Sequence, residues 1–321
     1  MQTYTAPLTL SQAAALRETL EAEGFDFSPR PYTQFFAQKG KVSVAVYEKG
    51  PKVVVQGKDT EDFVKFTLEP KVLGEARFGY EELLNPEMFQ PHFGIDESGK
   101  GDFFGPLVVA GVYVDGDITR AFLKAGVTDS KKIGSDRRIK ELARVISQTP
   151  GATQSVVLIG PERYNELYRK FANLNDLLGW GHARVIENLL TARPECPRAL
   201  SDQFANPRVI KNALLQRGKS IQVDQRTKAE SDAAVAAASI VARERFVSWL
   251  ENQGKAIGLT LGKGVSDQVK AAARELIARA GPEALPRFAK VHFRTAAEVL
   301  GPPAQAAGSP AEASDGPAEP G

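Results

Sequence analysis

Residues 94–101 read GIDESGKG and combine the side chains that proteins use to handle phosphate groups. The spacing glycine, four residues, glycine, lysine is that of a nucleotide phosphate loop, in which Ser or Thr follows the lysine. Here Gly101 follows the lysine, and Asp96 and Glu97 lie where backbone amides should surround phosphates. Buried carboxylates are costly to leave unpaired, and Mg²⁺ prefers carboxylate oxygens. The pair therefore favours a divalent-metal site, with a solvent-facing acidic turn as the alternative.

Two more carboxylates lie at positions where α/β folds build sites. Asp202 follows the apolar run at residues 198–200, and Glu230 stands just before an alanine-rich stretch. Strand ends and helix starts along one sheet edge commonly carry functional groups. Each residue also has a simpler interpretation, because Asp202 could cap the following turn and Glu230 could stabilise a helix N-terminus.

Adjacent residues of a strand normally point to opposite faces of the sheet. Asp96 and Glu97 can therefore reach one site only if their strand ends or bulges there. Gly99, Gly101 and Gly105 follow closely, and glycines inside or beside a strand commonly mark such an irregularity. The sequence thus permits both carboxylates to approach one cation.

The elements that position these residues fall into two groups. The N-terminal part has a helical pattern at residues 11–24 and β-rich runs separated by glycine turns at 32–40, 41–50 and 51–58. A second helix is predicted at 59–69, with Pro70 beyond its end, and the two prolines within 84–93 indicate a linker. Strands alternate with helices after that point, which predicts a central sheet covered on its faces. The predicted strands are 92–97, 106–114, 153–160, 198–204 and 220–225; the predicted helices are 135–148, 162–190, 206–218 and 231–254.

The composition limits the class of protein. Of the 321 residues, 42% are hydrophobic and 25% charged, and the net charge is +2, as in ordinary globular proteins. No apolar run is long enough to span a bilayer, and the N-terminus lacks a secretion signal. The single cysteine, Cys196, excludes an internal disulfide and a cysteine-based metal site. We expect a cytoplasmic protein without a membrane partner, and nothing demands more than a monomer.

Several separated motifs resemble one family in the same order. The stretch GIDESGKGDFFGPLVVAGV is similar to the signature of the type 2 ribonucleases H. The motifs TDSKKI, ALSDQFA, AESDAAVAAASIVARERF and AKVHF follow in the family's order. Three features resemble ribonuclease HIII in particular: the GKG loop where ribonuclease HII usually has GRG, Glu230 where it usually has Asp, and the stretch NLNDLLGWGHARVIENLL. The first 85 residues resemble, more loosely, the TATA-binding-protein-like domain of ribonuclease HIII.

The resemblance implies an α/β chain: a ribonuclease H-like fold, with a central mixed sheet flanked by helices, after a small α+β TATA-binding-protein-like domain. The implied organisation is a substrate-binding domain at 1–85, a linker at 86–91, a catalytic domain at 92–300, and a disordered Pro/Ala/Gly-rich tail at 301–321. The implied activity is hydrolysis of the RNA strand of RNA–DNA hybrids, leaving 5′-phosphate and 3′-hydroxyl ends. Two Mg²⁺ or Mn²⁺ ions would be held by Asp96, Glu97, Asp202 and Glu230, with Asp96 bridging them.

The resemblance also implies contacts with the nucleic acid. A glycine loop lets the main chain approach the minor groove, where RNA displays its 2′-hydroxyls, and lysines can neutralise phosphates. The implied substrate-binding residues are Gly99, Lys100, Gly101, Ser130, Lys131 and Ser239. Ordinary solvated turns are the alternative for the lysines, and a bond to its own helix backbone is the alternative for Ser239. His182 is not assigned to the site, and His292 is expected to be structural.

Aromatic and basic residues interleave in the N-terminal unit and could contact sugars, bases and phosphates. They are Tyr32, Phe35, Phe36, Lys39, Lys41 and Tyr47. Because a sheet alternates its faces, about half of these aromatics must instead belong to the core.

Three other functions stay open from the sequence. The first is cleavage at single ribonucleotides embedded in DNA, as in ribonuclease HII. The second is non-catalytic binding of hybrids, which the presence of all four carboxylates disfavours. The third is a phosphate-loop nucleotidase, which the missing Ser or Thr after Lys100 disfavours.

Overall fold

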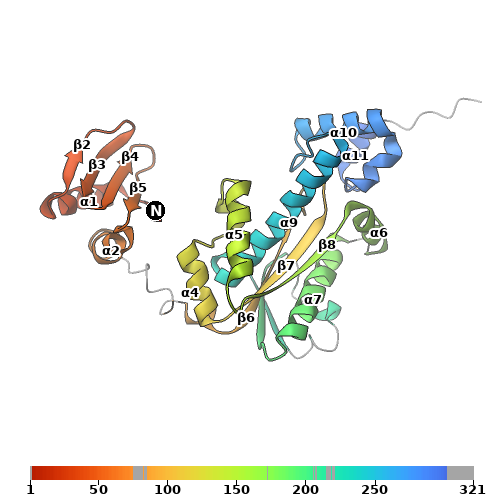
Figure 1. Cartoon of the computed structure of the whole chain (residues 1–321), viewed down its shortest axis with the longest axis horizontal. Helices are drawn as coiled ribbons and strands as arrows, with labels where there is room; N and C mark the ends of the chain where they lie inside the picture. Colours follow the sequence, from red (N-terminus) through yellow and green to blue (C-terminus); the bar gives the residue numbers. More distant parts are fainter. Residues whose placement is uncertain are drawn as a thin grey trace, which may run out of the picture. The chain divides into compact units, whose positions relative to one another are not determined.

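The chain divides into two compact units, Met1–Phe89 and Gln90–Gly321 (Figure 1). The computed structural model describes residues 2–74, 82, 85–171, 173–204, 206, 208–214, 218 and 221–301. The tail expected from residue 301 therefore lies outside the described residues apart from Gly301. Within the segment expected to be a linker, residues Pro86–Phe89 form a short 3₁₀ helix, η2. Each unit has its own cluster of buried apolar side chains.

The first unit is an antiparallel sheet of five strands in the order β1-β5-β4-β3-β2, with helices packed on one face. Alternate residues of the inner strands, such as Val44, Val46, Val53 and Val55, are buried beneath the helices, as expected of a sheet with one covered face. The strands are β1 (Gln2–Pro7), β2 (Asp26–Ser28), β3 (Thr33–Lys39), β4 (Val42–Tyr47) and β5 (Lys52–Gly57). The helices are α1 (Leu10–Ala22), α2 (Thr60–Phe63) and the wider π-helix η1 (Val64–Leu73).

Two details of this unit differ from the sequence prediction. The outer strands β1 and β2 were not predicted, and they form because each pairs with an inner strand of the sheet, β5 and β3 respectively. Pro70 lies inside η1 and not beyond the helix end. Proline lacks the N–H that an α-helix needs in its interior, and the chain there has the wider hydrogen-bond spacing of a π-helix.

The second unit is built on a mixed sheet of five strands in the order β10-β9-β6-β7-β8. Strands β6, β7 and β8 are antiparallel neighbours, whereas β9 runs parallel to β6 and β10 runs parallel to β9. This confirms the predicted fold class of a central mixed sheet flanked by helices. The strands are β6 (His92–Ser98), β7 (Leu107–Val114), β8 (Thr153–Ile159), β9 (Arg198–Asp202) and β10 (Gln222–Arg226).

Helices α9 and α7 cover opposite faces of this sheet. Two glycines permit the close approach: a Cβ on Gly94 would lie 2.1 Å from the backbone of Ala234 in α9, and one on Gly111 would lie 2.5 Å from Val185 in α7. The small residues of α9 have the same effect, because alanines let the helix lie close to the strands. Helix α5 packs on α9, and α8 packs on α7. The helices are α4 (Gly116–Ala125), α5 (Asp136–Gln148), α6 (Pro161–Phe171), α7 (Leu174–Ala192), α8 (Arg208–Ala213), α9 (Ala233–Ile257), α10 (Asp267–Ala280) and α11 (Arg294–Leu300).

Each predicted helix of this unit is present at the predicted position, but the unit has more helices than were predicted. The stretch 162–190 forms two helices, α6 and α7, and helices α4, α10 and α11 were not predicted. The start of α4 depends on Asp115, whose carboxylate accepts hydrogen bonds from the amides of Asp117 and Ile118. None of the helices in the described part of the chain is both long and apolar enough to cross a membrane.

Candidate active site

Two neighbouring strands bring the acidic residues of the second unit to one edge of the sheet. Strands β6 and β9 are parallel, and Ile95 pairs with Ser201. Asp96 and Asp202 are the next residues along their strands, so they lie side by side where β9 ends, while β6 stays paired with β7 as far as Ser98. Glu97 follows directly on β6. Three of the four predicted carboxylates therefore meet at the carboxyl ends of adjacent strands, where α/β sheets place ligands.

Glu230 reaches the same edge from the turn before α9. It lies on a short 3₁₀ helix, η5 (Ala229–Ser231). The amide of Ala229 donates a hydrogen bond to Oδ1 of Asp202 over 3.2 Å, which docks the turn on the end of β9. Lys228, just before the turn, has the left-handed backbone angle φ of 59°. Non-glycine residues in this conformation are uncommon and cluster at functional sites.

A cleft of about 510 Å³ opens at this edge and is lined by Asp96, Glu97 and Asp202. The glycine loop at residues 99–101, together with Ser130 and Lys131, forms much of the remaining wall. Glu230 is linked to this wall by Lys131, whose Nζ lies 4.0 Å from Oε1 of the glutamate. Arg243 and Lys263 also line the cleft. The cleft thus combines an acidic floor with lysine and arginine side chains.

The carboxylates repel one another in surroundings that disfavour charge. Burial raises the pKa of Asp96 well above its ordinary value, and the charge of Glu97 and that of Asp202 raise it further. A cation near these groups would reverse the effect, because a positive charge favours the ionised carboxylate.

Glu97 is held ionised by a histidine that was not assigned from the sequence. Burial alone would raise its pKa, but the hydrogen bond and charge of His182, with the charges of Lys100 and Lys131, lower it. The fully buried His182 places Nε2 3.0 Å from Oε2 of Glu97, and its Nδ1 lies 3.2 Å from Oγ of Ser201. An isolated histidine in a helical pattern gives no signal of this contact.

Lys131 is the shared countercharge of the site. Burial would lower the pKa of its ammonium, but the charges of Glu230, Asp96, Asp129 and Asp202 raise it. The same ammonium also acts on Glu97. The charge of Lys131 therefore lies within range of all four predicted carboxylates, although its side chain is 75% exposed and only Glu230 is in ion-pair contact with it.

The residues present fit divalent cations in their chemistry. All donors are carboxylate oxygens, the ligands that Mg²⁺ and Mn²⁺ prefer. Oε2 of Glu230 is buried and lacks a hydrogen-bond partner among the described residues. Within the same residues, no three Asp, Glu, His or Cys side chains are already close enough to enclose an ion. Binding a cation would therefore require the carboxylate side chains to move closer together.

The glycine loop is not a nucleotide phosphate loop. In that motif the loop opens a helix whose N-terminus binds the phosphates, whereas here the chain continues into strand β7. Gly99 has a φ of 87°, and a Cβ there would lie 2.1 Å from the carbonyl oxygen of Pro106. A Cβ on Gly101 would meet nothing within 4 Å. The loop is therefore fixed at Gly99 and presents open backbone at Gly101.

A buried lysine anchors the far side of this loop. Lys290, in the AKVHF motif, is fully buried, and its Nζ donates to the carbonyl oxygens of Asp102 and Gly105 over 2.9 and 2.6 Å. The adjacent His292 stacks on Tyr168 with ring centroids 4.0 Å apart.

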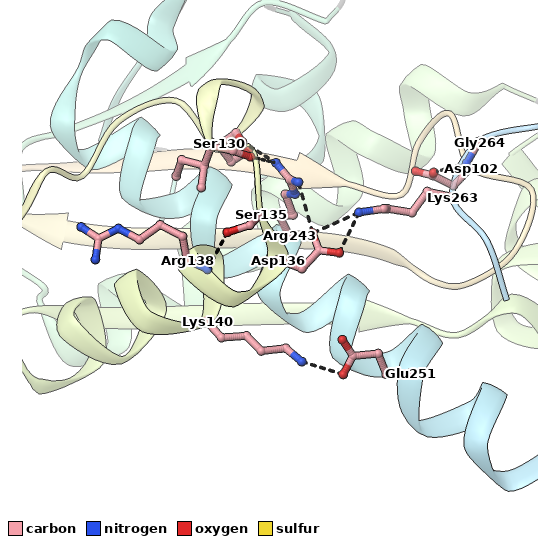
Figure 2. A network of polar contacts seen from close by, with 11 residues as sticks. Asp102, Ser130, Ser135, Asp136, Arg138, Lys140, Arg243, Glu251, Lys263 and Gly264 are labelled. Carbon is pink, nitrogen blue, oxygen red and sulfur yellow. Dashed lines mark hydrogen bonds and ion pairs between the residues drawn. The ribbon is translucent and has the colours of Figure 1, made fainter. Parts of the chain in front are cut away.

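Ser130 and Ser239 are joined by a hydrogen bond. The Ser239 side chain is only 3% exposed, accepts from the amide of Ser130 over 3.1 Å and donates to the carbonyl of Ala236. It is not among the cleft-lining residues, so it touches the cleft only through Ser130. Arg243 holds the same segment by donating to the carbonyl oxygens of Ser130 and Ile133 (Figure 2).

The aromatic residues of the first unit divide between core and surface. Phe35 is buried, whereas Tyr32 is 83% exposed and has a φ of 64°. Phe36 is partly exposed, with the guanidinium of Arg30 4.9 Å from its ring centroid. Tyr47 is also partly exposed. Tyr32, Phe36 and Tyr47 are therefore available to a partner.

Comparison with known proteins shows the family of this chain. A family model described as ribonuclease HII matches residues 93–296. A ribonuclease HIII of Protochlamydia amoebophila is 41% identical over 298 residues, which cover 93% of this chain and 97% of that protein. The chain belongs to the ribonuclease HIII family. It is thus an endoribonuclease, and the family resemblance found in the sequence is confirmed.

Solved structures of the family agree with this fold. A crystal structure of Bst-RNase HIII in complex with Mn²⁺ is 29% identical, with a TM-score of 0.65, covering 93% of this chain and 98% of that one. The RNase H3 of Aquifex aeolicus is 28% identical, with a TM-score of 0.52, covering 91% of this chain and 100% of that one. Both likenesses include the first unit, since the second unit alone could not account for this coverage.

Proposed function

We propose that this ribonuclease HIII hydrolyses the RNA strand of RNA–DNA hybrids with two divalent cations held by Asp96, Glu97, Asp202 and Glu230. The main support is the geometry: Asp96, Glu97 and Asp202 line one cleft beside the end of β9, and the turn that carries Glu230 is bonded to Asp202. Lys131 connects Glu230 to the same cleft. The Mn²⁺ bound by Bst-RNase HIII supports a divalent cation here. When bound by these carboxylates, such ions would supply an activated water and charge stabilisation for the leaving oxygen.

The protein's own contribution is to position the ligands and the substrate. Asp96 lies between Glu97, the next residue of β6, and Asp202 on the neighbouring strand β9, so it would contribute a ligand at the centre of the carboxylate set. His182 fixes the rotamer of Glu97, and the amide of Ala229 fixes Asp202. The products would carry a 5′-phosphate and a 3′-hydroxyl.

The substrate contacts follow from the walls of the cleft. Gly99, Lys100 and Gly101 would face the minor groove of the hybrid, where open backbone at Gly101 can approach a 2′-hydroxyl. Ser130 and Lys131 would contact a phosphate. We assign Ser239 the indirect role of holding the Ser130 amide, because its hydroxyl is buried and occupied.

The first unit is proposed to hold the hybrid outside the cleft. The support is its set of exposed aromatic and basic residues, including Tyr32 and Phe36. We propose residues 1–85 as the substrate-binding domain, 92–300 as the catalytic domain, and the tail from 301 as dispensable for activity. We further propose that the protein acts as a cytoplasmic monomer.

A cleavage assay tests this function. An RNA strand labelled at one end and annealed to DNA is incubated with Mg²⁺, with Mn²⁺ or with chelator. Single-stranded RNA, an RNA duplex and a DNA duplex with one embedded ribonucleotide serve as comparison substrates. Metal-dependent cutting of the hybrid is expected, with little cutting of the other three. Preferred cutting at the single ribonucleotide would assign ribonuclease HII-like behaviour, and hybrid binding without cutting would indicate a non-catalytic protein.

A further inference from the structure

The chain contains a second glycine–lysine–glycine triplet. Residues 262–264 read Gly-Lys-Gly, the same three residues as the loop at 99–101. The second triplet lies between α9 and α10, and no role has been assigned to it above. Lys263 lines the same cleft as Lys100 and Lys131.

Hydrogen bonds join the second triplet to the glycine loop. The amide of Gly264 donates to Oδ1 of Asp102 over 2.6 Å (Figure 2). In return, the carbonyl oxygen of Gly264 accepts from the amide of Phe103 over 3.1 Å. The two bonds run in opposite directions, so the turn that carries Lys263 is fixed to the end of the loop.

The space beside the Cα of Gly264 is open, as it is at Gly101. A Cβ on either residue would meet nothing within 4 Å. Gly264 has a φ of 75°, a conformation that glycine adopts without strain. The two turns differ at the glycine, because Gly101 lines the cleft whereas both backbone polar groups of Gly264 are bonded to the loop. The feature that they share at the cleft is the lysine.

The ammonium of Lys263 shares its carboxylate partner with a second cation. Its side chain is 47% exposed, and Nζ lies 2.9 Å from Oδ2 of Asp136. The other oxygen of Asp136 accepts from Nη2 of Arg243 over 3.2 Å (Figure 2). The nearby carboxylate of Asp102 accepts from the Gly264 amide, so Asp136 is the only carboxylate paired with Lys263 among the described residues.

We propose that Lys263 is a further substrate-binding residue, which contacts a backbone phosphate of the nucleic acid beside the glycine loop. The proposal rests on the proposed function, since it requires that the hybrid lies in this cleft. A fixed turn and a half-exposed ammonium that shares its only carboxylate partner are suited to a phosphate oxygen, without any reading of sequence. In the free protein the ammonium of Lys263 pairs with Asp136. In the complex the phosphate would take the place of Asp136.

The test is a count of phosphate contacts from the salt dependence of binding. Each lysine–phosphate contact contributes about one unit to the slope of log Kd against log salt concentration. Binding of a fluorescent RNA–DNA hybrid, measured by anisotropy in chelator, is compared for wild type and Lys263→Met. We expect the slope to fall by about one and Kd to rise about three- to ten-fold near 0.1 M salt. Thermal unfolding checks that the variant is folded.

Two matched variants separate phosphate binding from a structural effect. Lys140→Met removes a lysine paired with Glu251 over 2.6 Å outside the cleft, and it should leave the slope unchanged. Asp136→Asn breaks the same ion pair from the other side and retains Lys263. It should leave the slope unchanged and bind the hybrid equally well or more tightly.

Equal slopes for Lys263→Met and wild type would overturn the proposal, as would a matching loss of slope in Asp136→Asn. A wild-type protein that neither binds the hybrid in this assay nor cuts it with Mg²⁺ or Mn²⁺ would instead overturn the proposed function. The two failures are therefore distinguishable.

Discussion

Nε2 of His182 lies 3.0 Å from Oε2 of Glu97, although 85 positions separate the two residues in the chain. Helix α7 carries the histidine against the sheet, and the hydroxyl of Ser201 contacts the opposite ring nitrogen over 3.2 Å. The imidazole is thus held at both nitrogens, and one proposed metal ligand is held by the imidazole. A group that orients a ligand influences metal affinity without touching the metal.

Replacing this histidine should weaken metal activation more than it weakens the fold. In His182→Ala, Glu97 loses its hydrogen bond and its fixed rotamer. Loss of such an orienting partner costs on the order of 10–100-fold in metal affinity or activity. We expect the Mn²⁺ concentration for half-maximal cleavage to rise by that factor, measured by titrating metal at saturating hybrid.

The chain supplies a matched control for this experiment. His92 is also fully buried and places Nε2 3.0 Å from a carboxylate, that of Asp232, which caps α9. His92→Ala should lower Tm and leave the metal requirement unchanged. Equal shifts of the metal requirement in the two variants would mean that His182 stabilises the fold and does not orient a metal ligand.

Asp96→Asn should abolish cleavage and retain hybrid binding. The change removes a proposed metal ligand, while an asparagine Oδ1 can still accept the hydrogen bond from the Glu97 amide. Because burial and Glu97 raise the pKa of Asp96, ionising it costs free energy in the metal-free protein. The variant should therefore unfold at a higher Tm than wild type in chelator at pH 8. Normal cutting by the variant would show that the metal assignment is incorrect.

The stability contributed by Lys290 should depend on pH. Burial lowers its pKa from 10.5 to about 7, against a smaller opposing effect of Asp102. The other titratable groups around it are Tyr164, whose ring centroid lies 5.5 Å from Nζ, and His292. Between about pH 7 and pH 10.5 the unfolded chain binds this proton and the native protein does not. The free energy of unfolding therefore rises with pH in that window, by at most about 1.4 kcal/mol per pH unit from this group.

Lys290→Met removes this dependence while keeping a chain of similar length. Urea denaturation at several pH values between 7 and 10 should show a steeper rise for wild type than for the variant. The variant also loses the bonds to the carbonyl oxygens of Asp102 and Gly105, so its KM for the hybrid should increase. Parallel pH profiles for the two proteins would mean that Lys290 keeps an ordinary pKa.

Deleting residues 1–85 should weaken binding more than it slows turnover. The second unit has its own buried core, and the described residues that line its cleft lie between 96 and 263. We expect KM for a long hybrid to rise at least about ten-fold, while kcat at saturation changes by less than about three-fold. Tyr32→Ser in the full chain tests the same surface without a deletion. An unchanged KM in both proteins would show that the first unit does not bind the hybrid.

The local sequence determined the order of the main strands and helices and the places of the four carboxylates. Apolar residues and turn glycines predict the strands β6, β7 and β8. The acidic pair Asp96 and Glu97 predicts a divalent-metal site. These signals are local, because periodicity and turn propensity act over a few residues. Elements without such signals were missed, namely the paired edge strands β1 and β2 and the helices α4, α10 and α11.

Only the tertiary structure decided which distant groups complete the site. His182 joins Glu97, Gly264 joins Asp102 across 162 positions, and Lys290 joins Gly105 across 185. It also decided that Ser239 faces Ser130 and that Tyr32 is exposed while Phe35 is buried. Such pairs depend on how helices pack on the sheet and on which strands are neighbours. No periodicity within one segment contains that information, since it arises from contacts between segments.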